Sequence, residues 1–144
     1  MQLTAQQALE RAEEGGDHVI GWKLDPEQRK ELLMQFPPRY AQAVADHVTL
    51  SSRVSAGSEP PSETTGEIVG RADDGEGVEA MVVRIGDATD RPGGGTFHIT
   101  WSLANGRRAK ESNDVIARLG WEPLEMPMPV LLDPARWPRR ADPS

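Results

Sequence analysis

The sequence predicts an α+β protein with a mostly antiparallel sheet, or sheets, and two or three flanking helices. Stretches rich in β-branched and aromatic residues recur along the chain, and helical segments are set between them without regular alternation. Fourteen glycines and twelve prolines among 144 residues indicate many turns. The length suits one compact domain, which we place at residues 1–132, followed by a loosely ordered tail at residues 133–144.

The N-terminal part is predicted to run helix, strand, helix. Residues 4–14 form the first helix, because Thr4 and Gln7 fit a capping box and two glycines follow the segment. Residues 18–24 are β-branched and aromatic, which favours a strand. Asp25 then caps the second helix, and two consecutive prolines end it.

The rest of the chain reads as strands with one further helix. The strands are expected at residues 46–54, 67–73, 78–86 and 96–104. The second and third of these form a hairpin, whereas residues 55–66 form a loop by composition. Ser112 caps a helix that closes at Gly120, and residues 120–133 form one or two short β segments broken by prolines.

Composition and charge exclude several classes of function. The net charge of −7 argues against binding to duplex DNA, which needs a basic face. The absence of cysteine excludes disulfides, thiolate zinc sites and cysteine nucleophiles. No apolar run of about 18 residues predicts a membrane span, and the N-terminus lacks the apolar core of a secretory signal. We therefore expect a cytoplasmic monomer that does not bind membranes.

Two of the three histidines occur in the same short pattern, histidine, apolar residue, threonine. His47 and Thr49 lie in one predicted strand, and His98 and Thr100 lie in another. Residues i and i+2 of a strand point to the same face, so each pattern places an imidazole beside a hydroxyl and turns the apolar residue toward the core. If the strands are close, both pairs face one solvent-accessible cleft.

Such a pair of imidazoles suits metal-free cleavage of a phosphodiester. One neutral histidine accepts a proton from the attacking water, and one protonated histidine donates a proton to the leaving oxygen. The threonine hydroxyls can donate hydrogen bonds to the nonbridging oxygens as negative charge develops there. The alternative is that both phrases belong to ordinary half-buried strands, which tolerate histidine and threonine.

The phrases "HVTL" and "HITW" resemble the paired H-x-T motifs of the two-histidine (2H) phosphoesterase superfamily, which includes the LigT-like RNA cyclic phosphodiesterases. The resemblance covers roughly residues 18–132, and the two phrases lie closer together than in typical members. It implies a compact 2H phosphoesterase-like fold without a metal or another cofactor. It also implies hydrolysis of 2′,3′-cyclic phosphates or related phosphodiesters on RNA ends or nucleotides, with His47 as the acid and His98 as the base.

Several other residues are candidates for substrate contact. Arg53 keeps even spacing from His47 along its strand, and Tyr40 offers a ring on which a base could stack. Arg108 and Lys110 follow the second phrase and would supply the local positive charge that an acidic protein needs for an anion. A solvated loop explains most of these charges equally well. The remaining histidine, His18, lacks a threonine two residues later and is expected to be structural.

Two non-enzymatic functions stay open at this point. The chain could be a nucleotide- or RNA-end-binding module that keeps the pocket without turnover. It could also be an interaction domain whose acidic surface and proline-rich loops bind a protein. Turnover of a cyclic nucleotide in the presence of a chelator separates the enzyme from the first alternative, and the second predicts no nucleotide binding.

Overall fold

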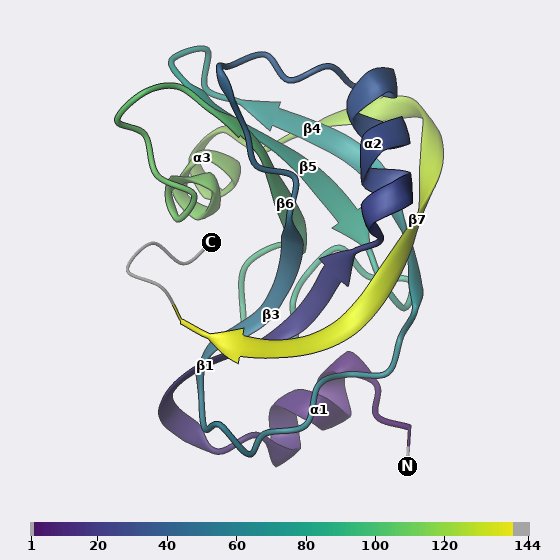
Figure 1. The fold of residues 1–144 in the computed structure, drawn as a ribbon, viewed down its shortest axis with the longest axis vertical. Coiled ribbons are helices and arrows are strands. Elements are labelled where there is room, and N and C mark those ends of the chain that lie inside the picture. Colours follow the sequence, from purple (N-terminus) through teal and green to yellow (C-terminus); the bar gives the residue numbers. More distant parts are fainter. Residues whose placement is uncertain (1, 140–144) are drawn as a thin grey trace.

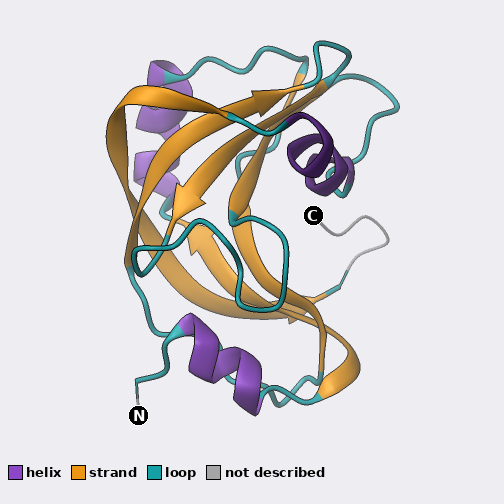
Figure 2. Cartoon of the chain, turned by 180° about the vertical axis from the view of Figure 1, so that it is seen from behind, coloured by secondary structure: helices purple, strands orange, loops and turns teal. Residues whose placement is uncertain are grey.

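The structure is a computed structural model that describes residues 2–139, and it confirms the α+β class. In this part of the chain one curled antiparallel sheet is flanked by three helices (Figures 1 and 2). The helices are α1 (Ala5–Arg11), α2 (Pro26–Gln35) and α3 (Glu111–Leu119). The strands are β1 (Glu14–Leu24), β2 (Gln42–Ala43), β3 (His47–Val54), β4 (Thr65–Asp73), β5 (Val78–Arg84), β6 (His98–Leu103) and β7 (Glu122–Pro138).

The sheet has the strand order β2-β6-β5-β4-β7-β1-β3, and every pairing is antiparallel. β4 and β5 form the hairpin that the sequence predicted. The long strand β7 joins the two halves, since its first part pairs with β4 and its last part pairs with β1. The sheet curls so far that β3, at one end of the order, lies against β6 near the other end. We call this junction the β3–β6 seam.

The prediction of one or two short β segments broken by prolines is wrong, because β7 is one long strand. The backbone N–H of Leu132 donates to the carbonyl of Thr64, on the β4 side of β7. Because backbone groups alternate along a strand, the N–H of Leu131 and the carbonyl of Pro129 point to the other edge of β7. The side-chain amide of Gln28 satisfies that edge, since it accepts from the Leu131 N–H at 2.6 Å and donates to the Pro129 carbonyl at 3.1 Å. Proline is tolerated there because no neighbouring strand needs its missing N–H.

The predicted tail is corrected as well. Residues 133–138 belong to β7 and pair with β1, where Lys23 faces Asp133 and His18 faces Pro138. Residues 140–144 of the predicted tail lie outside the described residues. The domain therefore extends at least to the end of β7, because a strand that completes a sheet is held by its ladder of backbone hydrogen bonds.

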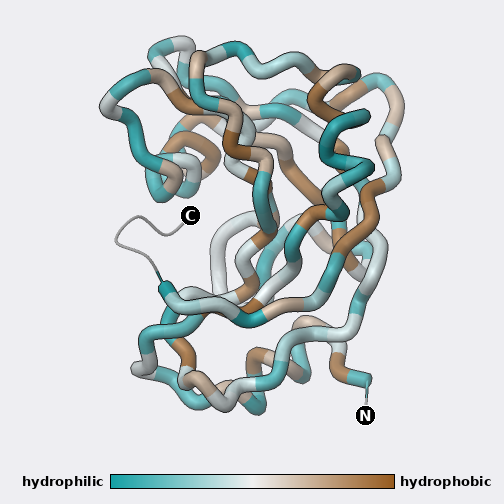
Figure 3. The backbone as a smooth tube through the Cα atoms, viewed as in Figure 1, coloured by the Kyte–Doolittle hydropathy of each residue, from teal (hydrophilic) through white to brown (hydrophobic). Residues whose placement is uncertain are grey.

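Apolar side chains form an inner and an outer cluster. The inner cluster fills the curled sheet and is closed by α1 and α2. The outer cluster lies between the sheet and α3 and consists of Val69, Ala72, Val78, Ala80, Val82, Leu103, Val115 and Ile116. β5 is covered on both faces, which explains its nearly continuous apolar sequence. Figure 3 shows apolar segments concentrated along the strands and polar segments in the outer loops.

The helix ends test the predicted caps. Thr4 forms the predicted capping box with Gln7, and Asp25 accepts a hydrogen bond from the backbone of Gln28 at the start of α2. The third prediction is wrong, because α3 begins at Glu111 and Ser112 lies inside it, fully buried. The Ser112 hydroxyl is used in a tertiary contact instead of a cap, as described below.

Candidate functional site

Both histidine phrases alternate along their strands as predicted. Val48 of β3 and Ile99 of β6 belong to the inner cluster, so the histidine and threonine on either side of each point outward. The register agrees, because His98 pairs with Val82, a member of the outer cluster. The four motif side chains therefore share the outer face of the sheet, on the two strands that meet at the β3–β6 seam.

The predicted solvent-accessible cleft is wrong for three of these four side chains. Thr49 is 4% exposed, His98 is 3% exposed and Thr100 is 2% exposed. The side chain of His47 keeps 17% of its surface exposed. The outer face is covered at this point by α3 and by the loop between β5 and β6, because alternation along a strand fixes the direction of a side chain but not what lies over it.

His98 is a buried imidazole with one nitrogen bonded and the other open. Its Nδ1 lies 2.9 Å from the carbonyl oxygen of Thr96. Since a carbonyl only accepts, Nδ1 carries the proton and Nε2 presents a lone pair. Nε2 is buried and has no hydrogen-bond partner among the described residues. Burial, aided by the charges of Arg91 and His47 and opposed by the hydrogen bond to Thr96, lowers the pKa of His98 to about 4, so the ring is neutral at pH 7.

Arg91, in the loop before β6, lies beside this imidazole. Its Nη2 donates to Asn113 Oδ1 at 2.8 Å, and its Nε donates to the Gly94 carbonyl at 3.1 Å. Nη1 reaches the Thr49 carbonyl at 3.4 Å, so one guanidinium connects the loop to α3 and to β3. Burial lowers the pKa of Arg91, and the structure records no ion pair for it within residues 2–139.

A cavity of about 340 Å³ opens next to His98. It is lined by Arg91, Gly94, Gly95, Thr96, His98, Asn113, Asp114, Ile116 and Ala117. We call it the His98 cavity. Its walls come from the start of β6, one side of α3 and the loop between β5 and β6, which we call the glycine loop because it contains Gly93, Gly94 and Gly95. The other three motif side chains are not part of these walls.

The hydroxyl of Thr100 is already occupied. Its Oγ1 lies 2.8 Å from the Ser112 hydroxyl and 3.3 Å from the carbonyl oxygen of Ala109. Both contacts attach the start of α3 to β6. This use of Thr100 departs from the role that the family resemblance implies, in which the threonine donates to a phosphate oxygen.

His47, on the other side of the seam, is oriented by a carboxylate. Its Nδ1 lies 2.9 Å from Asp46 Oδ2, which also accepts from Lys23 Nζ at 2.7 Å. These two partners hold the pKa of Asp46 well below its usual range, and the hydrogen bond with His47 lowers it most. The ring of Trp137 packs edge-on against His47 with centroids 5.0 Å apart, and Lys23 lies 4.4 Å from the same indole.

The structure does not bring the other predicted contact residues into the His98 cavity. Arg53 is exposed near the end of β3, and Arg108 and Lys110 are exposed in the turn that leads into α3. Lys110 is the residue that precedes α3 as its N-cap. None of the three lines the cavity.

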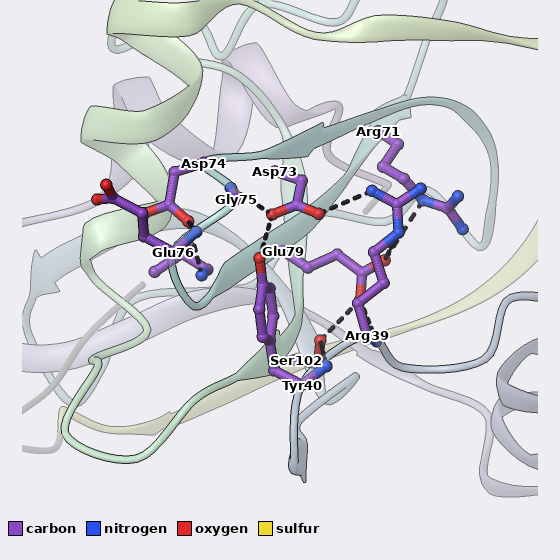
Figure 4. A network of polar contacts seen from close by, with 10 residues as sticks. Arg39, Tyr40, Arg71, Asp73, Asp74, Gly75, Glu76, Glu79 and Ser102 are labelled. Carbon is purple, nitrogen blue, oxygen red and sulfur yellow. Dashed lines mark hydrogen bonds and ion pairs between the residues drawn. The ribbon is translucent and has the colours of Figure 1, made fainter.

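Tyr40 lies in a separate network of charges at the far end of β5 and β6 (Figure 4). Its hydroxyl donates to Asp73 at 2.6 Å, and Asp73 also binds Arg39 at 2.7 Å. The centre of this network is Glu79, which is fully buried, accepts from Ser102 at 2.7 Å and lies between Arg39 and Arg71. Tyr40 is thus a structural residue in this arrangement.

Sequence reasoning missed Arg91, Asn113 and Asp46. Arg91 stands in a glycine-rich segment just before the second phrase, where no local pattern marks it as a binding residue. Asn113 follows Ser112 near the predicted start of a helix, and nothing local shows that it faces a loop arginine 22 positions earlier. Asp46 directly precedes His47, and this adjacency is the one signal that was available.

Further observations complete the site. Within residues 2–139 no group of three or more histidine, cysteine or carboxylate side chains has a metal-binding arrangement. No helix in the same range has both the length and the apolar character to cross a bilayer. In the comparisons with known proteins, the chain matches no protein-family model, no curated protein and no solved structure.

Proposed function

We propose that the protein is a metal-independent phosphodiesterase of the two-histidine type, acting in the cytoplasm. It hydrolyses a 2′,3′-cyclic phosphate or a related phosphodiester on an RNA end or a nucleotide. One observation carries the proposal. The open Nε2 of a neutral, buried His98 lies on the same outer face as His47, whose ring is oriented by Asp46.

His98 is suited to the role of base. A water molecule attacks phosphorus and forms the new P–O bond while its proton moves to the Nε2 lone pair of His98. His47, protonated, donates a proton to the oxygen whose bond to phosphorus breaks. An imidazole that stays neutral well below pH 7 is available to accept a proton. The assignment also matches the roles that the 2H resemblance implies for the two phrases.

Access to the site requires the glycine loop to move. The His98 cavity does not reach His47, so one phosphate contacts both imidazoles only after the cover has shifted. Gly94 and Gly95 have φ angles of 109° and 85°, in the region that favours glycine. The loop is therefore built from residues that can change conformation at low cost.

The second candidate is a nucleotide- or RNA-end-binding module without turnover. The bond between Thr100 and Ser112 favours it, because a hydroxyl held inside the protein is not available to stabilise charge in a transition state. In this case the ligand enters the His98 cavity and remains unchanged.

Turnover of 2′,3′-cyclic nucleotides in EDTA tests the proposal. We expect wild-type protein to open the ring, and both His47→Ala and His98→Ala to lose about 10²- to 10⁴-fold in kcat. His18→Ala is the matched control, since His18 also has its Nδ1 on a neighbouring carboxylate, Asp17, at 2.8 Å, but lacks the threonine. Binding without turnover by the wild type would favour the second candidate, and equal loss in His18→Ala would remove the special role of the two phrases.

A further inference from the structure

We propose that Arg91, held by Asn113, and His98 form a binding site for an oxyanion that carries a proton, with hydrogen phosphate as the simplest ligand. Both residues line the His98 cavity. The identification of this site with the position of the product, the phosphomonoester that forms when the cyclic phosphate is hydrolysed, rests on the proposed function, whereas anion binding itself does not require turnover.

The first argument is the unpaired charge of Arg91. Arginine stays protonated in proteins, so burial does not remove its charge. Its three partners are neutral oxygens, from Asn113, Gly94 and Thr49, and no carboxylate within residues 2–139 forms an ion pair with it. A partly buried charge without a counter-charge is costly. A bound anion would remove that cost, so anion binding at this site is energetically favourable.

The second argument is the number of free donors. A guanidinium has five N–H groups. One N–H on each of its three nitrogens is used by the three oxygens, which leaves one on Nη1 and one on Nη2. Free N–H groups on both terminal nitrogens can donate to two oxygens of one phosphate. The bonds to Asn113 and Gly94 fix the plane of the fork in advance.

The third argument comes from the tautomer of His98. Its buried Nε2 is an acceptor and repels an oxygen that has no proton. Hydrogen phosphate carries a proton at neutral pH and can donate its O–H to Nε2, whereas sulfate carries none. The site should therefore distinguish phosphate from sulfate, although the two ions have nearly the same size and shape.

The titratable and charged groups around the cavity fit this assignment. His98 and Arg91 come from β6 and the loop before it, and His47 lies across the seam, close enough to act electrostatically on His98. From α3, Asp114 lines the same cavity as the only carboxylate among its lining residues in the described chain. Asp114 makes no ion pair with Arg91, and its negative charge disfavours a multiply charged anion in the same cavity.

Calorimetric titration of the full chain with sodium phosphate and with sodium sulfate, at pH 7 and matched ionic strength, tests the inference. We expect phosphate to bind at least about ten-fold more tightly than sulfate, the difference that one satisfied hydrogen bond to a buried acceptor supplies. Arg91→Gln should lose about ten-fold or more in phosphate affinity. Arg118→Gln, which removes an exposed charge from α3, should leave the phosphate affinity unchanged.

His98→Gln provides an independent test if Arg91→Gln fails to fold. A glutamine amide can donate a hydrogen bond to an unprotonated oxygen, so the preference for phosphate over sulfate should largely disappear. Equal binding of both anions by the wild type, no phosphate binding, or full binding by Arg91→Gln would overturn the inference. Parallel assays with a cyclic nucleotide keep the two proposals apart: phosphate binding without turnover removes only the enzyme, and turnover without selective phosphate binding removes only the anion site.

Discussion

The hydroxyl of Thr100 on β6 lies 2.8 Å from the hydroxyl of Ser112 on α3, and both residues are buried. This contact ties the helix that covers the outer face to the strand that carries the second histidine phrase. It is also the reason that one of the two motif threonines is not open to a ligand in this arrangement.

Ser112→Ala should lower the free energy of unfolding by about 1 kcal/mol, because it removes one buried hydrogen bond. Thr100→Val should lower it by at least as much, because it removes the same bond and the longer contact with the Ala109 carbonyl. The double variant should cost less than the sum of the single variants, since the pair shares one bond. Urea denaturation of the four proteins measures this coupling. Strictly additive effects would contradict the contact.

The pH dependence of stability should carry the signature of His98. In the unfolded chain this histidine gains its proton near pH 6.5, whereas in the folded protein it does so only near pH 4. Between these values the unfolded state holds more protons, so the free energy of unfolding falls as the pH falls, by about 3 kcal/mol in total from this group. Its contribution is complete above pH 6.5.

The comparison of wild type with His98→Gln isolates this group. The variant should lose the part of the slope between pH 6.5 and pH 4, while His18→Gln should keep it. Denaturation curves at several pH values provide the measurement. If the slopes of wild type and His98→Gln agree throughout this window, the imidazole of His98 is not held neutral by burial.

The pH dependence of the proposed reaction follows from the same group. If His98 is the base, kcat/KM for a cyclic nucleotide should fall on the acid side with a midpoint near pH 4, with a second fall on the alkaline side when the acid loses its proton. EDTA should not change the profile. Circular dichroism at each pH controls for unfolding, and an acid midpoint close to that of free histidine would argue against His98 as a buried base.

The charge network in Figure 4 should be important for stability. Glu79 is fully buried between Arg39 and Arg71, so Glu79→Gln leaves two arginines without their shared counter-charge. We expect a loss of about 3–5 kcal/mol in the free energy of unfolding. Glu122→Gln, at an exposed position, should change it by less than about 0.5 kcal/mol. Similar small effects of both changes in urea denaturation would show that the network does not stabilise the fold.

The close approach of β1 to β3 gives a last prediction. A Cβ atom added at Gly21 would lie 2.2 Å from the Val48 carbonyl oxygen, which is backbone and cannot rotate away. Gly21→Ala should therefore cost about 3 kcal/mol or more, because the strands must separate. Gly57→Ala, where nothing lies within 4 Å, is the matched control and should be nearly neutral. Equal melting temperatures of the two variants would contradict the observed register.

The sequence by itself determined the features that depend on near neighbours along the chain. The capping box of Thr4 and Gln7 and the cap at Asp25 follow from local hydrogen bonding, and the β4–β5 hairpin follows from its turn residues. The outward direction of His47 and His98 follows from the two-residue period of a strand. These features need no knowledge of what packs against them.

Only the tertiary structure decided what lies next to those outward side chains. The burial of His98, the use of Thr100 by Ser112 and the position of Arg91 depend on α3 and a glycine-rich loop folding over the β3–β6 seam. The single long β7 likewise depends on Gln28, about a hundred residues earlier in the chain, which satisfies its open edge. Contacts between residues this far apart are set by the packing of the whole sheet, and a local pattern carries no record of them.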